Sequence, residues 1–379
     1  MAEDPVVTGA RAMIFHVPFP LRREAATGSG IRPVQLRRAF EELGWQVWEI
    51  SGTAAQRAAA FRRVRAAVRS GVRFEFVYSE SSTLPNTFAG PSRRPHAFLE
   101  ARIFAFCRRR GIPVGVFYRD IYWHGGPLGS GRQLAVNLLF RAAYRYDLLV
   151  YRLLVKRLFV PSIAMAEKMP WTRRQQCVAL PPAADPVDSP VPTGPPNLFY
   201  VGGLGPYYRL TECVAAVGDR PEISMTVCTP PELWERHHAD YEPLPANVEI
   251  VHASGAGLQE FYDRSGLGVL FLEPIAYREF AAPLKLFEYL AQGKPIIAVD
   301  GSLAGRFVTD HGVGWTLPYR REALVALLDR LTADPAEYQA ARERCLAVRG
   351  ENTWTARAAQ AAALLGTTPP HRPESEHHP

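Results

Sequence analysis

The amino-acid sequence predicts an α/β protein with two Rossmann-like domains. Its 379 residues exceed one ordinary hydrophobic core and suit two domains. Short apolar runs alternate with helical stretches, as in parallel sheets whose strands are connected by helices. This alternation stops at a proline-dense segment, 185–196, and then restarts. The segment is therefore predicted to be an interdomain linker.

In the first series, apolar runs bounded by turn residues predict strands, and longer stretches with helical periodicity predict helices. Strands are expected at 12–17, 45–50, 74–79, 114–119 and 158–162. Helices are expected at 32–44, 54–71, 94–111 and 131–157. Residues 177–196 are expected to be irregular because prolines are dense there. Together these elements predict an N-terminal domain over residues 1–184.

The second series predicts a C-terminal domain over residues 197–350. Its strands are expected at 197–205, 223–228, 247–252, 266–274, 295–299 and 313–318. The segment 351–366 is expected to be a final helix. Residues 367–379 are rich in proline and charge and are expected to be disordered.

The segment 283–292 is predicted to be a short helix, and the apolar run 295–299 after it is predicted to be a buried strand. Pro283 suits the first helical position, and Gly293 suits the left-handed position that ends a helix. Two arcs are expected at helical spacing. The apolar arc holds Leu284, Leu286, Phe287, Leu290 and Ala291, and the polar arc holds Lys285, Glu288, Tyr289 and Gln292.

Lys285 and Glu288 admit two interpretations. At a spacing of three residues they fit a solvated ion pair that contributes only about 0.2–0.5 kcal/mol. Alternatively, the free N–H groups of the first turn bind a phosphate, and Lys285 adds a point charge beside them. Glu288, one turn further on, could then accept the hydroxyls of a ribose. Phosphate and sugar diol together describe a nucleotide.

Ligands of open α/β sheets bind at the carboxyl ends of strands, so the segments that follow the strands are searched for a site. Gly28 and Gly30 follow the first strand and could bring backbone N–H groups near a phosphate, although such a pair is often only a flexible turn. Asp120 lies at the end of a strand in a segment rich in charge and aromatic residues, 119–125. A glycine-rich segment, 202–210, opens the second series. These segments are expected to converge on one cleft.

Composition limits the other function classes. The five cysteines are scattered and odd in number, which indicates reduced thiols in the cytoplasm and no disulfide framework. No spacing typical of a metal site is present. The first residues lack the pattern of a signal peptide, and basic residues interrupt the longest apolar region, 134–160. We therefore expect a cytoplasmic protein without a metal site.

Charge is distributed unevenly along the chain. Residues 1–180 contain 28 Lys and Arg against 12 Asp and Glu, a net charge of +16, whereas the remainder carries −9. A membrane, nucleic-acid or phosphorylated partner would explain the basic half, and so would a solvated arginine-rich surface. Because no nucleic-acid-binding module is recognised, no nucleic-acid partner is expected. The amphipathic region 134–157 favours docking on the anionic inner face of a membrane.

Several segments resemble GT-B-fold glycosyltransferases, particularly the retaining family 4, which includes bacterial polysaccharide and exopolysaccharide transferases. "APLKLFEYLAQGKPIIA" (282–298) is similar to their donor-binding signature, in its Pro-x-Lys-x-x-Glu-Tyr version. "FYVGGLG" (199–205) resembles the segment that opens their C-terminal domain. "VGVFYRDIYW" (114–123) resembles their strand ending in His-Asp, and "NTWTARAAQAAALL" (352–365) the final helix that returns to the N-terminal domain. The resemblance implies two Rossmann-like domains facing each other across a cleft.

The resemblance also implies roles for residues. Glu288 would hold the ribose hydroxyls, Lys285 would neutralise the diphosphate, and Asp120 would lie at the end of the N-domain strand. Backbone groups near the phosphates are implied at Gly202, Gly203, Pro283, Leu284, Gly28 and Gly30.

The sequence departs from the family at three places. The family's first motif glutamate would fall at Phe280, one residue after Glu279. Gly203 stands where the family has arginine, so Arg209 is expected to supply the second phosphate cation. Arg119 stands in place of the histidine before Asp120, which would suit a different donor sugar, an acidic one for example.

From the resemblance we expect a hexosyltransferase-type glycosyltransferase in polysaccharide biosynthesis. It would move sugar from a nucleotide-diphosphate sugar to a hydroxyl of a glycan, a lipid-linked intermediate or a small molecule. Retention of configuration is implied, with no metal and no cofactor. An inverting enzyme would instead need a base, for which Asp120 is the candidate. A GT-B-fold sugar-nucleotide epimerase or hydrolase is the alternative, because it would use the same donor site.

Overall fold

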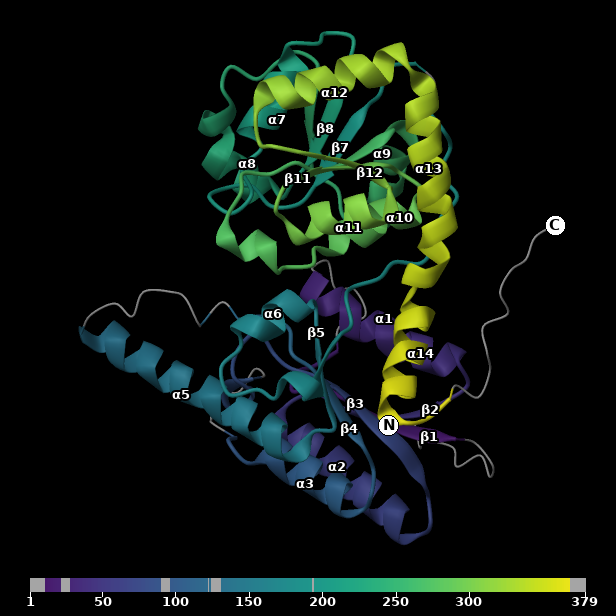
Figure 1. Ribbon diagram of the computed structural model, residues 1–379. Coiled ribbons are helices and arrows are strands. Elements are labelled where there is room, and N and C mark those ends of the chain that lie inside the picture. The colour runs from purple at the N-terminus through teal and green to yellow at the C-terminus, as the bar shows by residue number, and fades with distance from the viewer. Residues whose placement is uncertain are drawn as a thin grey trace, which may run out of the picture. The chain divides into compact units, whose positions relative to one another are not determined.

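The chain's computed structural model describes residues 11–21, 28–89, 96–121, 123, 131–192 and 194–368. Its contacts divide it into two compact units. Unit 1 comprises Met1–Pro181 and Trp354–Pro379, and unit 2 comprises Pro182–Thr353. Each unit contains one six-stranded sheet in which all the pairings are parallel (Figure 1).

The sheet of unit 1 has the strand order β2-β1-β3-β4-β5-β6. Its strands are β1 (Ala12–His16), β2 (Gln46–Ile50), β3 (Phe74–Glu80), β4 (Val114–Phe117), β5 (Arg157–Val160) and β6 (Cys177–Ala179). Every residue of β1 and β4 is buried, as expected for central strands covered on both faces. The strand order reverses between β1 and β3, which makes this the topological switch point of the sheet.

The short strand β6 contradicts the prediction that residues 177–196 are irregular throughout. It pairs with β5, from Leu158 opposite Cys177 to Val160 opposite Ala179. The prolines begin only at Pro181. The three residues before them keep their N–H groups and can add one edge strand to the sheet.

The helices of unit 1 are α1 (Gly28–Glu42), α2 (Ala54–Arg69), α3 (Leu99–Arg109), α5 (Gly131–Leu154), α6 (Ile163–Lys168) and α14 (Trp354–Leu365). Short 3₁₀ turns lie at Asn86–Phe88 (η1) and Arg174–Gln176 (η2). Helix α1 begins four residues before its predicted start. The last helix, α14, belongs to unit 1 and lies beside α1 (Figure 1).

The sheet of unit 2 has the strand order β12-β11-β10-β7-β8-β9. Its strands are β7 (Leu198–Val201), β8 (Met225–Cys228), β9 (Val248–Val251), β10 (Leu267–Leu270), β11 (Ile296–Val299) and β12 (Gly314–Leu317). Each overlaps a predicted strand. The switch point lies between β7 and β10.

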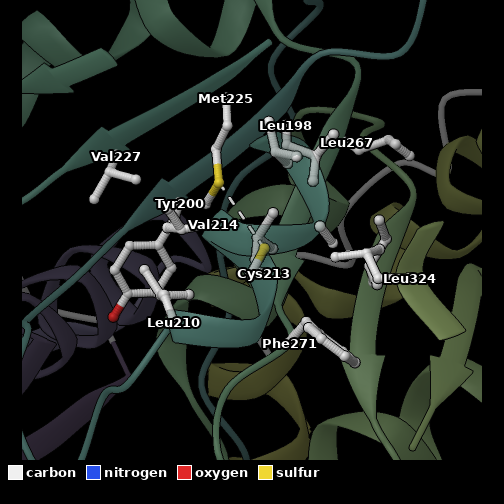
Figure 2. Close-up of a cluster of buried hydrophobic side chains, with 14 of the residues drawn as sticks. Leu198, Tyr200, Leu210, Cys213, Val214, Met225, Val227, Leu267, Phe271 and Leu324 are labelled. Carbon is white, nitrogen blue, oxygen red and sulfur yellow. Dashed lines mark hydrogen bonds between the residues drawn. The ribbon is translucent and has the colours of Figure 1, made fainter. Parts of the chain in front are cut away.

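Helices cover both faces of the second sheet. They are α7 (Thr211–Gly218), α8 (Pro231–His237), α9 (Gln259–Arg264), α10 (Leu284–Ala291), α11 (Leu303–His311), α12 (Arg321–Ala333) and α13 (Pro335–Arg349). The 3₁₀ turns are η3 (His238–Tyr241), η4 (Gly255–Leu258), η5 (Ala276–Glu279) and η6 (Gly350–Asn352). Helices α7 and α12 lie on one face and α10 and α11 on the other (Figure 1). Figure 2 shows the buried cluster on the first of these faces, where Cys213 and Leu324 pack against β7 and β8.

The proline-rich segment predicted as a linker is hydrogen-bonded to the carboxyl end of α10. The amide of Val187 donates to the carbonyl of Ala291 at 3.1 Å, and Lys294 Nζ donates to the carbonyl of Pro190 at 3.0 Å. Burial lowers the pKa of Lys294 to about 8. Residues from Pro182 onward therefore form part of unit 2.

No helix in the described part of the chain combines the length and the apolarity needed to cross a membrane.

Candidate active site

Helix α10 begins with backbone donors that no side chain caps. Pro283, predicted as the first helical residue, is instead the N-cap, with φ −74° and ψ 136°, so the helix begins one residue later than predicted. Proline has no side-chain acceptor, and the N–H groups of Leu284 and Lys285 have no acceptor among the described residues. Lys285 is the second helical residue, as predicted. The start of α10 therefore presents free donors and partial positive charge.

Helix α11, on the same face of the sheet, begins differently. The hydroxyl oxygen of Ser302 accepts a hydrogen bond from the amide of Gly305 at 2.8 Å. Such a cap satisfies a donor internally. The N–H groups of Leu303 and Ala304 likewise have no acceptor among the described residues, so both helices keep two unused donors at their starts, and they differ only in the cap.

The polar arc predicted for α10 is only partly correct. Lys285 and Glu288 are half-buried, but Tyr289 and Gln292 are buried. Gln292 exchanges hydrogen bonds with Gln259, which explains its burial. The aromatic ring of Tyr289 lies within the core on this face of the sheet. Helical periodicity alone could not separate these two from the exposed polar residues.

Tyr289 fixes α10 to the strand that precedes the glycine turn. The amide of Val201, the last residue of β7, donates to the Tyr289 hydroxyl at 3.2 Å. The ring passes over Gly268 of β10, where an added Cβ would lie 2.3 Å from the ring. Only glycine leaves room for this crossing.

The turn after β7 is closed by an aromatic hydroxyl. Tyr200 Oη donates to the carbonyl of Gly203 at 2.6 Å. A Cβ on Gly202 would lie 2.7 Å from the hydroxyl oxygen of Tyr200. The closed turn holds the backbone of Gly202 and Gly203 at the carboxyl end of the strand.

A pocket of about 250 Å³ lies at the switch point of unit 2. Its walls come from the ends of β7 and β10, from η5, and from the starts of α10 and α11. Five of the predicted donor-site residues line it together: Gly202, Gly203, Pro283, Leu284 and Lys285. Switch points of open parallel sheets are where such folds bind ligands.

Among the described residues, the lining of this pocket carries two cations and no carboxylate. Lys285 Nζ lies 2.6 Å from Glu288 Oε2, which also accepts a hydrogen bond from Tyr262 at 3.2 Å. Glu288 is therefore next to the pocket but is not part of its wall. The second cation is Arg278.

Arg278 belongs to η5 and was not identified from the sequence. Its guanidinium donates to the carbonyls of Glu273, at 2.9 Å, and Tyr207. It forms no ion pair with any described residue. Burial lowers the pKa of this guanidinium from its ordinary value. The sequence carries a signal for it, because Arg278 follows the predicted strand 266–274 by four residues.

Arg209, predicted to be a phosphate cation, does not line this pocket. Its guanidinium lies 3.5 Å from Glu273 Oε2, and both side chains are almost half exposed. Its carbonyl accepts the amide of Glu273 at 3.1 Å. Among the described residues, Arg278 and Lys285 are the cations of the pocket wall.

The remaining predicted site residues belong to unit 1. Gly28 and Gly30 lie in the first turn of α1. Arg119 lies beyond β4 and pairs with Glu80 at 3.0 Å, and burial lowers its pKa. Asp120 is half-buried, and its Oδ1 accepts the amide of Ile121 at 2.6 Å.

Glu80, the last residue of β3, is fully buried between two arginines. Arg119 contacts one carboxylate oxygen, and Arg32 of α1 contacts the other at 3.2 Å. Tyr78 also donates to Glu80, at 3.1 Å. Charges at the strand ends of unit 1 therefore pair with one another.

The polar segment after β3 is also used within unit 1. The amide of Asn86 donates to Asp147 Oδ2 at 2.8 Å, and its side-chain amide donates to the hydroxyl of Tyr151 at 2.6 Å. Burial raises the pKa of Asp147 to about 7. The polarity of this segment is accounted for by these contacts.

Among the described residues, no group of three or more His, Cys, Asp or Glu side chains is arranged to hold a metal ion.

Comparison with known proteins gives matches in structure only. No protein-family model and no curated protein matches the chain. Sucrose-phosphate synthase from Thermosynechococcus elongatus matches with a TM-score of 0.62 and 16% identity, over 93% of this chain and 98% of that one. Anabaena HepE, in complex with UDP-glucose, matches with a TM-score of 0.61 and 11% identity, over 93% and 99%.

WaaG, a glycosyltransferase involved in lipopolysaccharide biosynthesis, matches with a TM-score of 0.57 and 13% identity, over 93% of this chain and 100% of that one. At these identities the likeness concerns the fold. The α/β fold class predicted from the sequence is confirmed, and the chain has the fold of the GT-B glycosyltransferases.

Proposed function

We propose that the chain is a glycosyltransferase of the hexosyltransferase type, which takes its sugar from a nucleotide-diphosphate sugar. The observation that carries this proposal is the pocket at the switch point of unit 2. Its wall combines Lys285, Arg278, the uncapped start of α10 and the bare backbone of Gly202 and Gly203, with no carboxylate. Such a wall is complementary to a diphosphate.

The chemistry of the pocket would be electrostatic. Breaking the bond between the anomeric carbon and the diphosphate places negative charge on the leaving group. Fixed donors and cations stabilise that charge, and one such group contributes about 3 kcal/mol. Lys285 and Arg278 could supply this stabilisation without a metal, so we propose metal-independent transfer.

Glu288 would hold the ribose hydroxyls. It lies one turn after Lys285, adjoins the pocket and accepts hydrogen bonds from Tyr262 and Lys285. A carboxylate held in this way is oriented before a ligand binds. We propose that the same contact keeps Lys285 extended toward the diphosphate.

We further propose a retaining course. In that case no side chain has to act as base, and Asp120 would orient the sugar or the acceptor. The support for retention is the resemblance of residues 282–298 to the family 4 signature. Proton NMR of the anomeric coupling in the product tests it. A β-linked product from an α-configured donor would overturn retention and would make Asp120 the candidate base.

For the acceptor we propose a lipid-linked or glycan hydroxyl in polysaccharide biosynthesis, reached from an anionic membrane surface. Helix α5 exposes Leu138, Leu139, Leu149 and Leu153 at helical spacing, together with Arg145 and Arg152. Its one carboxylate, Asp147, is buried. Exposed leucines with arginines and no exposed carboxylate fit an anionic lipid surface.

The proposed function is tested with a panel of nucleotide sugars. The matching donor should raise the melting temperature, because a ligand at 100 times its Kd adds about 2.7 kcal/mol of stability. That donor, mixed with lipid-linked and glycan acceptors, should then yield a glycosylated product detected by mass spectrometry. A donor that binds and is only hydrolysed or epimerised would overturn the transferase assignment. Absence of binding to every nucleotide sugar would overturn the donor site itself.

A further inference from the structure

Unit 1 contains a second pocket, far along the sequence from the first. Its volume is about 480 Å³. It lies where α3 and α5 end and β4 and β5 begin, at the amino ends of these strands. This is the opposite edge of the sheet from the switch point. The proposed transfer reaction makes no use of it.

The described residues that line this pocket include no carboxylate and five cations: Arg108, Arg152, Lys156, Arg157 and Arg173. None of them forms an ion pair with a described residue. Four are instead held by backbone carbonyls. Arg108 donates to Leu153, Arg152 to Trp171 at 3.2 Å, Lys156 to Leu365 at 3.0 Å and Arg157 to Gln175 at 3.2 Å.

Neutralisation of helix ends does not account for this number of cations. Basic residues commonly stabilise the carboxyl end of a helix, where the macrodipole amounts to about half an elementary negative charge. The carboxyl ends of α3 and α5 together therefore amount to about one negative charge, which about one cation would neutralise. Five cations leave a surplus of roughly four. A multiply charged anion would balance that surplus.

Two buried atoms in the pocket lining lack a partner in the described structure: Nε of Arg157 and Oε1 of Gln176. The Gln176 side chain is itself fixed, since its amide nitrogen donates to the carbonyls of Tyr151, at 2.9 Å, and Val155. Both atoms are closed to solvent, so they show unused hydrogen-bonding capacity in the pocket wall and not contacts that are already open to a ligand.

We propose that this pocket of unit 1 binds a phosphomonoester or a diphosphate, as a second anion site independent of the pocket in unit 2. Arginine fits this ligand because its planar fork pairs with phosphate oxygens. The phosphate could belong to a soluble phosphorylated compound or to a lipid headgroup. Arg152 and Leu153 belong both to this pocket and to the exposed face of α5.

Isothermal titration of the full chain with inorganic pyrophosphate tests the site. The double variant Arg152→Gln/Arg173→Gln removes two cations with exposed side chains. We expect pyrophosphate affinity at this site to fall by about tenfold or more, because charge-assisted hydrogen bonds are lost. The matched control Arg62→Gln/Arg63→Gln removes two exposed arginines of α2, outside the pocket, and should leave affinity unchanged.

Lys285→Met separates this site from the proposed donor pocket. Pyrophosphate binding that survives Lys285→Met and is lost in Arg152→Gln/Arg173→Gln supports the second site. Equal affinity in the pocket double variant and the control double variant would overturn it, as would binding abolished by Lys285→Met alone. Should the double variant melt at a lower temperature than wild type, Arg173→Glu replaces it, because no hydrogen bond or ion pair involves that side chain in the described structure.

Vesicles distinguish the source of the phosphate. Sedimentation is compared between neutral vesicles and vesicles containing phosphatidic acid, whose headgroup is a phosphomonoester. If pyrophosphate competes with phosphatidic acid binding, and the double variant loses that binding, the headgroup is the source. If pyrophosphate binds while the vesicles do not, a soluble phosphate is the source. Both outcomes support the site. If neither pyrophosphate nor the phosphatidic acid vesicles bind, the site is overturned.

Discussion

The two sheets use the charges at their switch points in opposite ways. In unit 1, Glu80 ends β3 and is buried between Arg32 and Arg119, so the charges satisfy one another. In unit 2, Lys285 and Arg278 stand in a pocket wall whose described residues include no carboxylate, and the one partner carboxylate, Glu288 on Lys285, lies beside the wall. Buried ions that pair with each other mainly maintain a structure, whereas cations facing an open pocket can act on a ligand. The comparison teaches that position at a strand end does not by itself indicate a ligand site.

The largest expected effect tests the buried side of this comparison. Glu80→Gln keeps the shape but leaves two arginines buried without a carboxylate. Breaking a buried pair in this way costs about 3–5 kcal/mol. Urea unfolding at neutral pH measures the loss, with Glu42→Gln, an exposed glutamate on α1, as the control. A loss as small as that of the control would mean that water already reaches the Glu80 network.

Lys285→Met tests the open side. The change keeps helix propensity and removes the charge from the pocket wall. We expect kcat to fall by about 10²–10³-fold, as for loss of one preorganised donor. Stability should change by less than about 1 kcal/mol, because the lost pair with Glu288 is partly exposed.

Arg209→Gln is the matched control for Lys285→Met, since it removes a cation that lies outside the pocket wall. Its kcat should stay within about twofold of wild type because the guanidinium does not face the pocket, and its stability should change by about 1 kcal/mol or less because the pair with Glu273 is exposed. Equal losses of kcat in Lys285→Met and Arg209→Gln would contradict the assignment of Lys285, and not Arg209, to the pocket that acts on the donor.

The dependence of stability on pH tests a second buried charge of unit 1, Asp147. Its pKa is about 7 in the folded chain because of burial, and about 4 when unfolded. Between these values the folded chain holds a proton that the unfolded chain has released. The contribution of Asp147 to stability is therefore complete below about pH 4 and is lost as the pH rises to about 7.

Asp147→Asn should remove this dependence while keeping an acceptor for the amide of Asn86. Relative to wild type, the variant should gain up to about 1.4 kcal/mol per pH unit between pH 5 and pH 7. Urea unfolding at pH 5, 6, 7 and 8 gives the difference. Parallel profiles for the two proteins would contradict the elevated pKa.

The smallest expected effect concerns Glu288. Glu288→Ala should weaken binding of the nucleotide sugar by about tenfold, the contribution of a hydrogen bond to a charged group. Glu260→Ala is the control, because it removes an exposed carboxylate of α9 that lies outside the pocket wall. Unchanged donor affinity in Glu288→Ala would leave Lys285 and Glu288 as a solvated ion pair.

The sequence predicted those parts of the site that depend on local chemistry. A short helix starting near Pro283, Lys285 in its first turn and the paired glycines 202 and 203 were all identified from neighbouring residues. The fold class followed for the same reason, because apolar runs and turn residues are local signals. The strand β6 was missed because the prolines that follow it predicted irregular structure for the whole segment 177–196.

Pairings between residues distant in the sequence could not be predicted. Arg119 pairs with Glu80, which lies 39 residues away in the chain, and no local pattern indicates this pair. Tyr289 was placed on a polar arc, yet it is buried and its hydroxyl accepts the amide of Val201, 88 residues away. Such outcomes are set by strand order and by packing across the sheet, which periodicity in one segment does not contain.

The crossing of Tyr289 over Gly268 has a consequence for how this protein can change over generations. A methyl group at position 268 would collide with the ring, and removal of the ring would release α10 from the end of β7. A substitution at position 268 or at position 289 alone would therefore move the start of α10. Descendants of this sequence should keep the glycine and the tyrosine together or replace both at once. Such linked replacement would be visible in aligned relatives even where Lys285 itself is unchanged.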